Sequence, residues 1–249
     1  MKLEAVMGKV HRKTNRAGLT LALMLTITLS TSSCAVRKTE PRSSSPDQEV
    51  FYPNTISTKE FSENSISFTK EEDILFITRT KGWEYQSGHL SKRENGVYTR
   101  TQALRQLDTI YNGAINPSGD RIIFSKKVNQ EEEIYLLSNQ AHELCCVENI
   151  TARSKVYGGY FNWVSDEELY FYSPINHGDI VQAIFKNGTL TIVDSLEILN
   201  TKDGTEFSPY VNAVKGYLIF TRYLKGEVDQ LVFFVSFSRS KGAQPGWST

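Results

Sequence analysis

One alternation of polar and apolar positions recurs four times along the chain. In each copy a large apolar residue is followed by a polar turn and then by a short apolar triplet rich in β-forming residues. The copies are Phe68–Ile77, Ile115–Phe124, Trp163–Phe171 and Val211–Phe220. Their triplets end 47, 47 and 49 residues apart, which predicts a structural repeat of about 48 residues.

Each repeat predicts three or four short antiparallel strands. A second β-rich run follows the triplet, as at Ile134–Leu137, and Asn95-Gly96 and Asn187-Gly188 are strong hairpin signals. Outside the N-terminal segment, no window of a dozen residues has a helical period. A small sheet that is apolar on both faces needs a neighbour on each side. We therefore predict an all-β fold, a β-propeller with four recognisable blades, over a β-sandwich with coincidental spacing.

The repeats resemble a known family. INPSGDRIIFSKK from Ile115, followed by EIYLLS, resembles the PD40 repeat of TolB-like, WD40-like β-propellers. The fourth repeat, from Glu206 to Phe237, resembles a blade of propeller lipoproteins common in Bacteroidota, and the likeness extends from about Phe51 to Trp247. The family usually has five or six blades. The resemblance therefore implies either an incomplete propeller or a four-bladed ring that residues 51–58 help to close.

The N-terminus is predicted to be a lipoprotein signal. Residues 1–33 combine basic residues, the apolar run Ala17–Leu29 and small residues before Cys34, the layout of a signal peptide. The ending resembles the lipobox of bacterial lipoproteins, although Thr31 stands where Leu is usual, and this resemblance implies lipidation of Cys34. The alternatives are an uncleaved anchor helix or a plain signal with a coincidental cysteine.

Residues 34–50 predict a flexible tether, and residues 51–249 the propeller domain. The tether is rich in Ser, Pro and charged residues and has no apolar period. No Asp follows Cys34 directly, and by resemblance to known sorting rules this favours the outer membrane. We expect an outer-membrane lipoprotein whose domain faces the periplasm.

Composition narrows the class of partner. The chain has 249 residues, with 28 Lys and Arg against 28 Asp and Glu, so it lacks the positive field of most nucleic-acid binders. Only one apolar run is long enough to be discussed as a membrane segment, which excludes a polytopic membrane protein. We expect no nucleic-acid partner, and membrane contact only through the lipid. We expect Cys145 and Cys146 to be buried and unpaired, with a strained vicinal disulfide as the alternative.

No motif predicts catalysis. The sequence lacks G-x-S-x-G, P-loop, G-x-G-x-x-G and calcium-loop patterns, and His142-Glu143 does not continue into H-E-x-x-H. The histidines His89, His142 and His177 fall in three different repeats. The acidic runs 131–133 and 166–168 fall in predicted turns, where they should be solvated. We predict no catalytic residue, no metal and no cofactor, and therefore not an enzyme.

Equivalent charged positions suggest a binding surface. Glu63 and Glu206 each precede the first strand of a repeat, and Arg79 and Arg222 each follow a triplet. We take these four residues as a candidate partner-binding surface, with structural salt bridges across blades as the alternative. The predicted function is a non-catalytic cell-envelope lipoprotein that binds a protein, peptide or glycan partner. The alternatives are a propeller hydrolase or lyase with a site at the channel mouth, or a truncated inactive paralogue.

Overall fold

A computed structural model describes residues 49–249, except 83–85, 141–142, 225–230, 239–246 and 249. The chain divides into two units, residues 1–48 and Glu49–Thr249, and the second is the subject below. The predicted signal peptide, Cys34 and nearly all of the predicted tether lie outside the described residues. Within the described ranges, no helix is long and apolar enough to cross a membrane.

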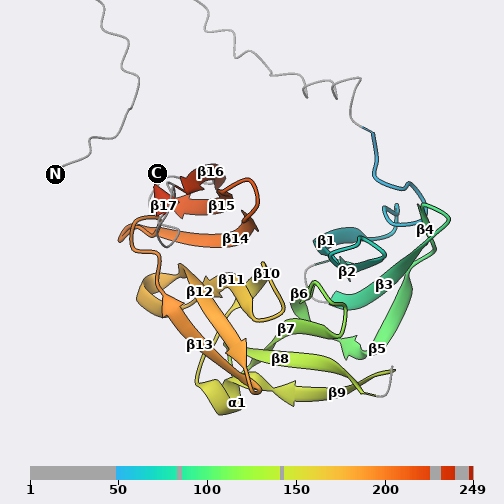
Figure 1. The fold of residues 1–249 in the computed structure, drawn as a ribbon, viewed down its shortest axis with the longest axis horizontal. Coiled ribbons are helices and arrows are strands. Elements are labelled where there is room, and N and C mark those ends of the chain that lie inside the picture. Colours follow the sequence, from blue (N-terminus) through green and yellow to red (C-terminus); the bar gives the residue numbers. More distant parts are fainter. Residues whose placement is uncertain (1–48, 83–85, 141–142, 225–230, 239–246, 249) are drawn as a thin grey trace, which may run out of the picture. The chain divides into compact units, whose positions relative to one another are not determined.

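The described strands form four antiparallel sheets, one after another along the chain (Figure 1). Blade 1 contains β1 (Ser62–Phe68), β2 (Ile74–Thr80), β3 (Gln86–Glu94), β4 (Val97–Tyr98) and β5 (Gln102–Asp108), and both β4 and β5 pair with β3. Blade 2 contains β6 (Tyr111–Ile115), β7 (Arg121–Val128), β8 (Glu131–Gln140) and β9 (Glu143–Asn149). Blade 3 contains β10 (Gly159–Trp163), β11 (Glu168–Ser173), β12 (Asp179–Lys186) and β13 (Thr189–Asp194). Blade 4 contains β14 (Gly204–Asn212), β15 (Tyr217–Leu224), β16 (Leu231–Ser238) and β17 (Trp247–Ser248).

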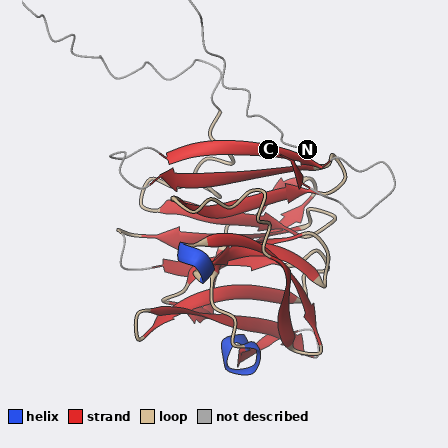
Figure 2. Ribbon diagram, turned by 90° about the vertical axis from the view of Figure 1, so that its left-hand side faces the viewer, coloured by secondary structure: helices blue, strands red, loops and turns tan. Residues whose placement is uncertain are grey.

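Helical structure is minor. Figure 2 shows strands throughout the described unit and two short helical segments, α1 (Ile150–Ser154) and the 3-10 turn η1 (Ile175–His177). The first strand of each blade, β1, β6, β10 or β14, contacts the first strand of the next blade. The predicted all-β class and the four-bladed β-propeller are therefore confirmed.

The four triplet ends occupy matching positions. Phe124, Phe171 and Phe220 are almost fully buried, and each packs against apolar side chains of the preceding blade. Ile77 occupies the corresponding position in blade 1, where Ile56 covers it. The residue just before each triplet end faces the other way and is buried in blades 1 to 3, so these three blades bury apolar groups on two sides. These preceding residues of blades 1 to 3 are Phe76, Ile123 and Tyr170.

A repeated backbone hydrogen bond joins successive blades. In each junction, an amide at or just before the first strand of one blade donates to a carbonyl at or just before the third strand of the preceding blade. The bonds are Ile110 N to Gln86 O at 3.2 Å, Gly158 N to Glu132 O at 3.0 Å and Glu206 N to Gly178 O at 3.0 Å. Three equivalent bonds fix the same displacement from each blade to the next.

The two outermost blade faces differ. Residues 51–58 cover the outer side of blade 1, where Ile56 packs with Leu75 and Ile77. Residues 51–58 therefore pack on blade 1, and their part in closing a four-bladed ring stays a prediction. On blade 4 the outer side carries Phe233 and Val235, which are 77% and 50% exposed. The described apolar clusters link blades 1 to 2, 2 to 3 and 3 to 4.

Asn116 connects the turns of blades 2 and 3. Its Nδ2 lies 2.7 Å from both Asp120 Oδ1 and Asp166 Oδ1, and its Oδ1 accepts from Arg121 N at 2.9 Å. Asp166 belongs to the turn between β10 and β11 of blade 3, and it also accepts from Ser118 N at 2.9 Å. The fully buried amide of Asn116 therefore stabilises its own turn and binds the turn of the neighbouring blade.

We predict that Asn116→Ala lowers the free energy of unfolding by about 2–3 kcal/mol, because it leaves buried donors and acceptors without partners. Urea unfolding followed by tryptophan fluorescence measures the change. Asp203→Ala, at an exposed position, serves as the control and should stay within about 0.5 kcal/mol of the parent. Equal stability of the two variants would contradict a structural role for the Asn116 network.

Candidate functional site: a cavity at the propeller axis

Each innermost strand bulges at the same place. Its register against the second strand shifts once, leaving residues outside the ladder. Every bulge contains a non-glycine residue in the left-handed region: Ser65 (φ 49°), Asn112 (φ 46°), Tyr160 (φ 57°) and Ser208 (φ 52°). This conformation is uncommon for such residues and is found where the surrounding structure enforces it, often at functional sites.

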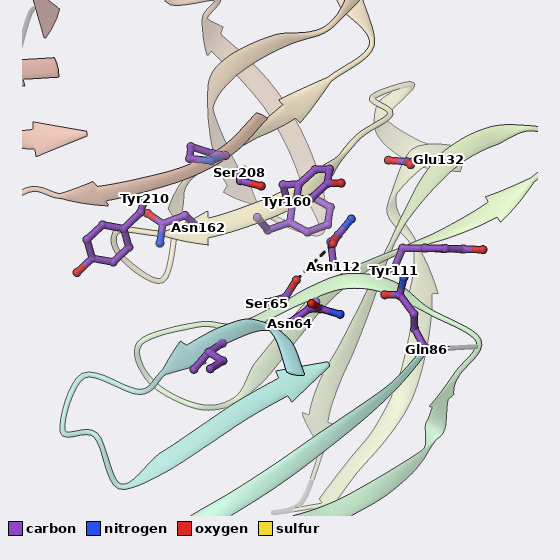
Figure 3. Close-up of a pocket in the computed structure, with 14 residues that line it drawn as sticks. Asn64, Ser65, Gln86, Tyr111, Asn112, Glu132, Tyr160, Asn162, Ser208 and Tyr210 are labelled. Atoms are coloured by element: carbon purple, nitrogen blue, oxygen red, sulfur yellow. Dashed lines mark hydrogen bonds between the residues drawn. The ribbon is translucent and has the colours of Figure 1, made fainter. Parts of the chain in front are cut away.

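All four bulges line one cavity of about 530 Å³, to which every blade contributes (Figure 3). That volume lies in the range typical of small-ligand sites. Its walls combine amide side chains, hydroxyl groups and aromatic rings. The lining residues are Asn64, Ser65, Ile66, Gln86, Tyr111, Asn112, Gly113, Glu132, Tyr160, Phe161, Asn162, Ser208, Pro209 and Tyr210.

Hydrogen bonds between neighbouring inner strands hold the cavity wall. Ser65 Oγ donates to Asn112 Oδ1 at 3.3 Å, as the dashed line in Figure 3 marks. Ser67 Oγ accepts from Ile115 N, and Asn162 Oδ1 accepts from Val211 N, each at 2.9 Å. The wall is therefore built by contacts from blade 1 to blade 2 and from blade 3 to blade 4, as well as by the backbone junctions.

Glu132 is the only charged residue among the described lining residues. It is half-buried, and its Oε2 atom is fully buried without a hydrogen-bond partner among the described groups. Burial raises the pKa of Glu132, and the charge of Lys127 opposes that shift. Gln86, at the equivalent register position of blade 1, likewise has a buried Oε1 atom without a partner.

Two tyrosines of blade 3 lie near the same carboxylate. Burial raises the pKa of Tyr160 and of Tyr172, and the negative charge of Glu132 adds to both shifts. A hydrogen bond with Asn112 counters part of the shift in the pKa of Tyr160. These groups can donate and accept hydrogen bonds and can stack on a ligand, so the arrangement suits recognition.

The candidate residues from the sequence lie elsewhere. Glu63 pairs with Arg79 across β1 and β2 at 3.4 Å, and Glu206 pairs with Arg222 across β14 and β15 at 2.6 Å. These side chains are 0% to 12% exposed. Each pair lies within one blade, whereas the alternative reading of the sequence placed it across two. None of the four residues lines the cavity, and their partner-binding role stays a prediction.

The two ion pairs have the same surroundings. Arg79 Nη2 donates to Ile56 O at 2.7 Å, and Arg222 Nη2 donates to Leu199 O at 2.6 Å. The hydroxyl groups of Thr58 and Thr201 donate to the glutamates, each at 2.8 Å. Each pair thus ties the segment that enters a blade to its first two strands, which explains the repetition of these residues in structural terms.

The sequence reasoning missed Glu132. The predicted solvated turn at 131–133 is wrong, because β8 begins at Glu131 and all three glutamates belong to this strand. Glu131 is exposed, Glu132 faces the cavity, and Glu133 accepts a hydrogen bond from Tyr135 at 2.9 Å. Alternation along the strand directs Glu132 to the opposite face from Glu131 and Glu133. Glu132 lies at the same register position as Gln86, and comparing these two positions between the repeats would have indicated that Glu132 faces the cavity.

The described residues contain no group of three or more His, Cys, Asp or Glu side chains placed to hold a metal ion. His89 lies on β3, outside the cavity lining, and His142 lies outside the described residues. The Cys145 and Cys146 sulfurs lie 2.8 Å apart without a disulfide bond. Cys145 is exposed, so its predicted burial is wrong, and a register shift in the pairing of β8 with β9 sets the cysteines beside each other.

Comparisons with known proteins find only distant structural similarities. No family model and no curated protein matches the chain. The structure is similar to TolB from Acinetobacter baumannii, with a TM-score of 0.49 and 12% identity over 75% of this chain and 43% of that one. It is also similar to a putative TolB from Agrobacterium tumefaciens, with a TM-score of 0.45 and 11% identity over 75% of this chain and 80% of that one. A third similar structure is the propeller domain of the Trilobed protease from Pyrococcus furiosus, with a TM-score of 0.43 and 10% identity over 76% of this chain and 57% of that one. The chain thus spans less than half of the first TolB chain. By its own four blades it is a β-propeller protein.

We predict that Glu206→Gln lowers the free energy of unfolding by about 3 kcal/mol, because the buried Arg222 loses its counter-charge. Chemical denaturation measures the loss. The exposed Glu197→Gln is the matched control. An unchanged midpoint for Glu206→Gln would contradict a structural role for this pair.

We also predict a pH effect from His89. Burial, assisted by the charge of Arg79, lowers the pKa of His89 to about 4 from the ordinary 6.5. The unfolded chain therefore takes up this proton first, and the contribution of His89 is complete above pH 6.5 and lost as the pH falls toward 4. The loss is on the order of 1 kcal/mol after solvent screening of the half-buried ring.

The measurement compares the parent protein with His89→Gln, whose side chain does not titrate. Urea midpoints at intervals from pH 7 to pH 4 should fall more steeply for the parent. Parallel curves for the two proteins would show that His89 contributes nothing to the pH dependence.

Proposed function

We propose that this protein is a non-catalytic binding module of the bacterial cell envelope, and that the axial cavity holds a peptide segment of a partner protein. The observation that carries this proposal is the convergence of four equivalent bulges on one cavity. Bulge residues outside the strand ladder bring main-chain groups to the wall, beside amide side chains such as Asn64 and Gln86. These donors and acceptors match the alternating groups of a peptide backbone.

The aromatic part of the wall supports the same proposal. Tyr111, Tyr160, Phe161 and Tyr210 line the cavity, and Tyr210 is 50% exposed. Exposed aromatic rings beside hydrogen-bonding groups are typical of recognition sites, since they bury a large area at a small entropy cost. A partner side chain can therefore stack at the edge of the cavity while its backbone bonds to the wall.

The proposed location comes from the N-terminal sequence. Removal of residues 1–33 and lipidation of Cys34 would tether the domain to the outer membrane, facing the periplasm. In that location the propeller meets envelope proteins. The lipid would supply the membrane contact, and the propeller would supply the choice of partner.

We predict that Tyr210→Ala reduces capture of the partner at least about tenfold, because it removes an exposed ring at the cavity edge. The tagged full-length protein is expressed in envelope-containing cells, cross-linked, and purified from the membranes, and the bound proteins are quantified by mass spectrometry. Tyr223→Ala is the matched control, since Tyr223 is 41% exposed and lies outside the cavity lining.

The proposal is contradicted if Tyr210→Ala and Tyr223→Ala capture the same proteins in equal amounts. A Cys34→Ser form, compared under the same conditions, separates the anchor from the cavity. The proposed division of roles predicts that this form loses membrane association but still binds the partner when purified partner is added.

A further inference from the structure

We propose that Glu132 is the specificity residue of the cavity and that it binds a cationic group, the ammonium or guanidinium of a Lys or Arg side chain in the bound peptide. This inference rests on the proposed function and names the chemistry that the cavity selects. It starts from an imbalance in the site, namely a carboxylate whose inner oxygen has no partner.

Among the described residues Glu132 has no direct ion-pair partner. Of the described lining residues, only Glu132 is charged. Lys127 lies opposite Glu132 in the pairing of β7 with β8, but it is exposed, and the described salt bridges do not include this pair. Burying a carboxylate without a partner is costly, and a bound cation removes that cost directly.

The position of Glu132 is supported by its surroundings. Its Oε2 atom lies so close to Gly159 that a Cβ atom there would come within 2.9 Å, so the absent side chain provides the space. Ser125 Oγ and Asn112 Nδ2 would lie 3.3 and 3.5 Å from the same Cβ position. The buried Oε2 atom therefore lies against the backbone of Gly159, with the polar groups of Ser125 and Asn112 near the same position. An ammonium or guanidinium group only donates hydrogen bonds, so the carboxylate of Glu132 and the hydroxyl oxygen of Tyr160 are acceptors that the cavity wall can offer it.

The aromatic wall fits the rest of a basic side chain. Figure 3 shows the Tyr160 side chain directed from β10 toward Glu132, with Asn112 beside it. Lys and Arg have long apolar stems that pack on rings, and their charged ends interact favourably with ring faces. A stem lying along Tyr160 would place its charged end at Glu132. An acidic ligand would meet repulsion there, and a neutral one would leave the carboxylate unpaired.

The test measures binding of tripeptides with blocked ends to the full-length protein by ligand-observed NMR near neutral pH. The central residue is lysine, norleucine or glutamate, so the probes differ in charge at similar length. We expect the lysine peptide to bind at least about tenfold more tightly than the norleucine peptide, and the glutamate peptide not to bind. Glu132→Gln should remove the preference for lysine, whereas the adjacent exposed Glu131→Gln should keep it.

A stability measurement separates recognition from a structural role. Glu132→Gln relieves an unpaired buried charge, so the variant should be at least as stable as the parent. Equal binding of the lysine and norleucine peptides by the parent overturns the inference without reference to any variant. Binding of glucosamine at least as tight as that of the lysine peptide would overturn the assignment to a peptide side chain.

The outcomes also distinguish this inference from the proposed function. If Tyr210→Ala loses the captured partner but Glu132→Gln keeps it, the cavity binds a partner without using the carboxylate, and only the cation inference fails. If neither variant changes capture, the proposed function fails as well.

Discussion

The structure depends on burial of the apolar faces of the small sheets against neighbouring blades and, on the outer side of blade 1, against residues 51–58. An isolated four-stranded sheet cannot cover two apolar faces, so each blade is stable only within the series. Phe124, Phe171 and Phe220 show this constraint, since each is buried by the preceding blade. A fully buried aromatic or aliphatic side chain contributes roughly 1.5–3 kcal/mol, and in blades 1 to 3 the residue before the triplet end is also buried, on the opposite face.

The backbone hydrogen bonds between blades position the inner strands so that they form the cavity. Because the amides of Ile110, Gly158 and Glu206 bond to equivalent carbonyls, each inner strand takes the same place relative to the blade before it. The bulges then fall at one level, and their left-handed residues meet around the same cavity. The cavity is thus a consequence of the repeat, while its particular chemistry comes from the residues that differ between blades.

That distinction explains what the sequence could and could not predict. The blades were predictable because periodicity, turn residues and triplets repeat at fixed intervals, and a repeated pattern reports repeated packing. A structural salt bridge involving Glu63 and Arg79 was one of the two readings of the sequence. That the two residues pair within one blade could not be predicted, because it depends on the register of β1 with β2. Glu132 was missed because a shift of one position at the start of β8 decides whether a side chain faces solvent or the axis.

The buried acidic residues separate stability from recognition. Glu206 is fully buried, and although its Oε2 atom, like that of Glu132, has no described partner, its Oε1 atom pairs with Arg222 and accepts from Thr201, so its charge is neutralised inside the blade. Glu132 is less buried, but its Oε2 atom has no described partner and the described salt bridges give it no counter-charge. A residue that lowers stability, and that no contact inside the protein compensates, is expected where a ligand supplies the missing interaction. The asymmetry between these two carboxylates is therefore the physical reason to look for a cation at the axis and not at the blade edges.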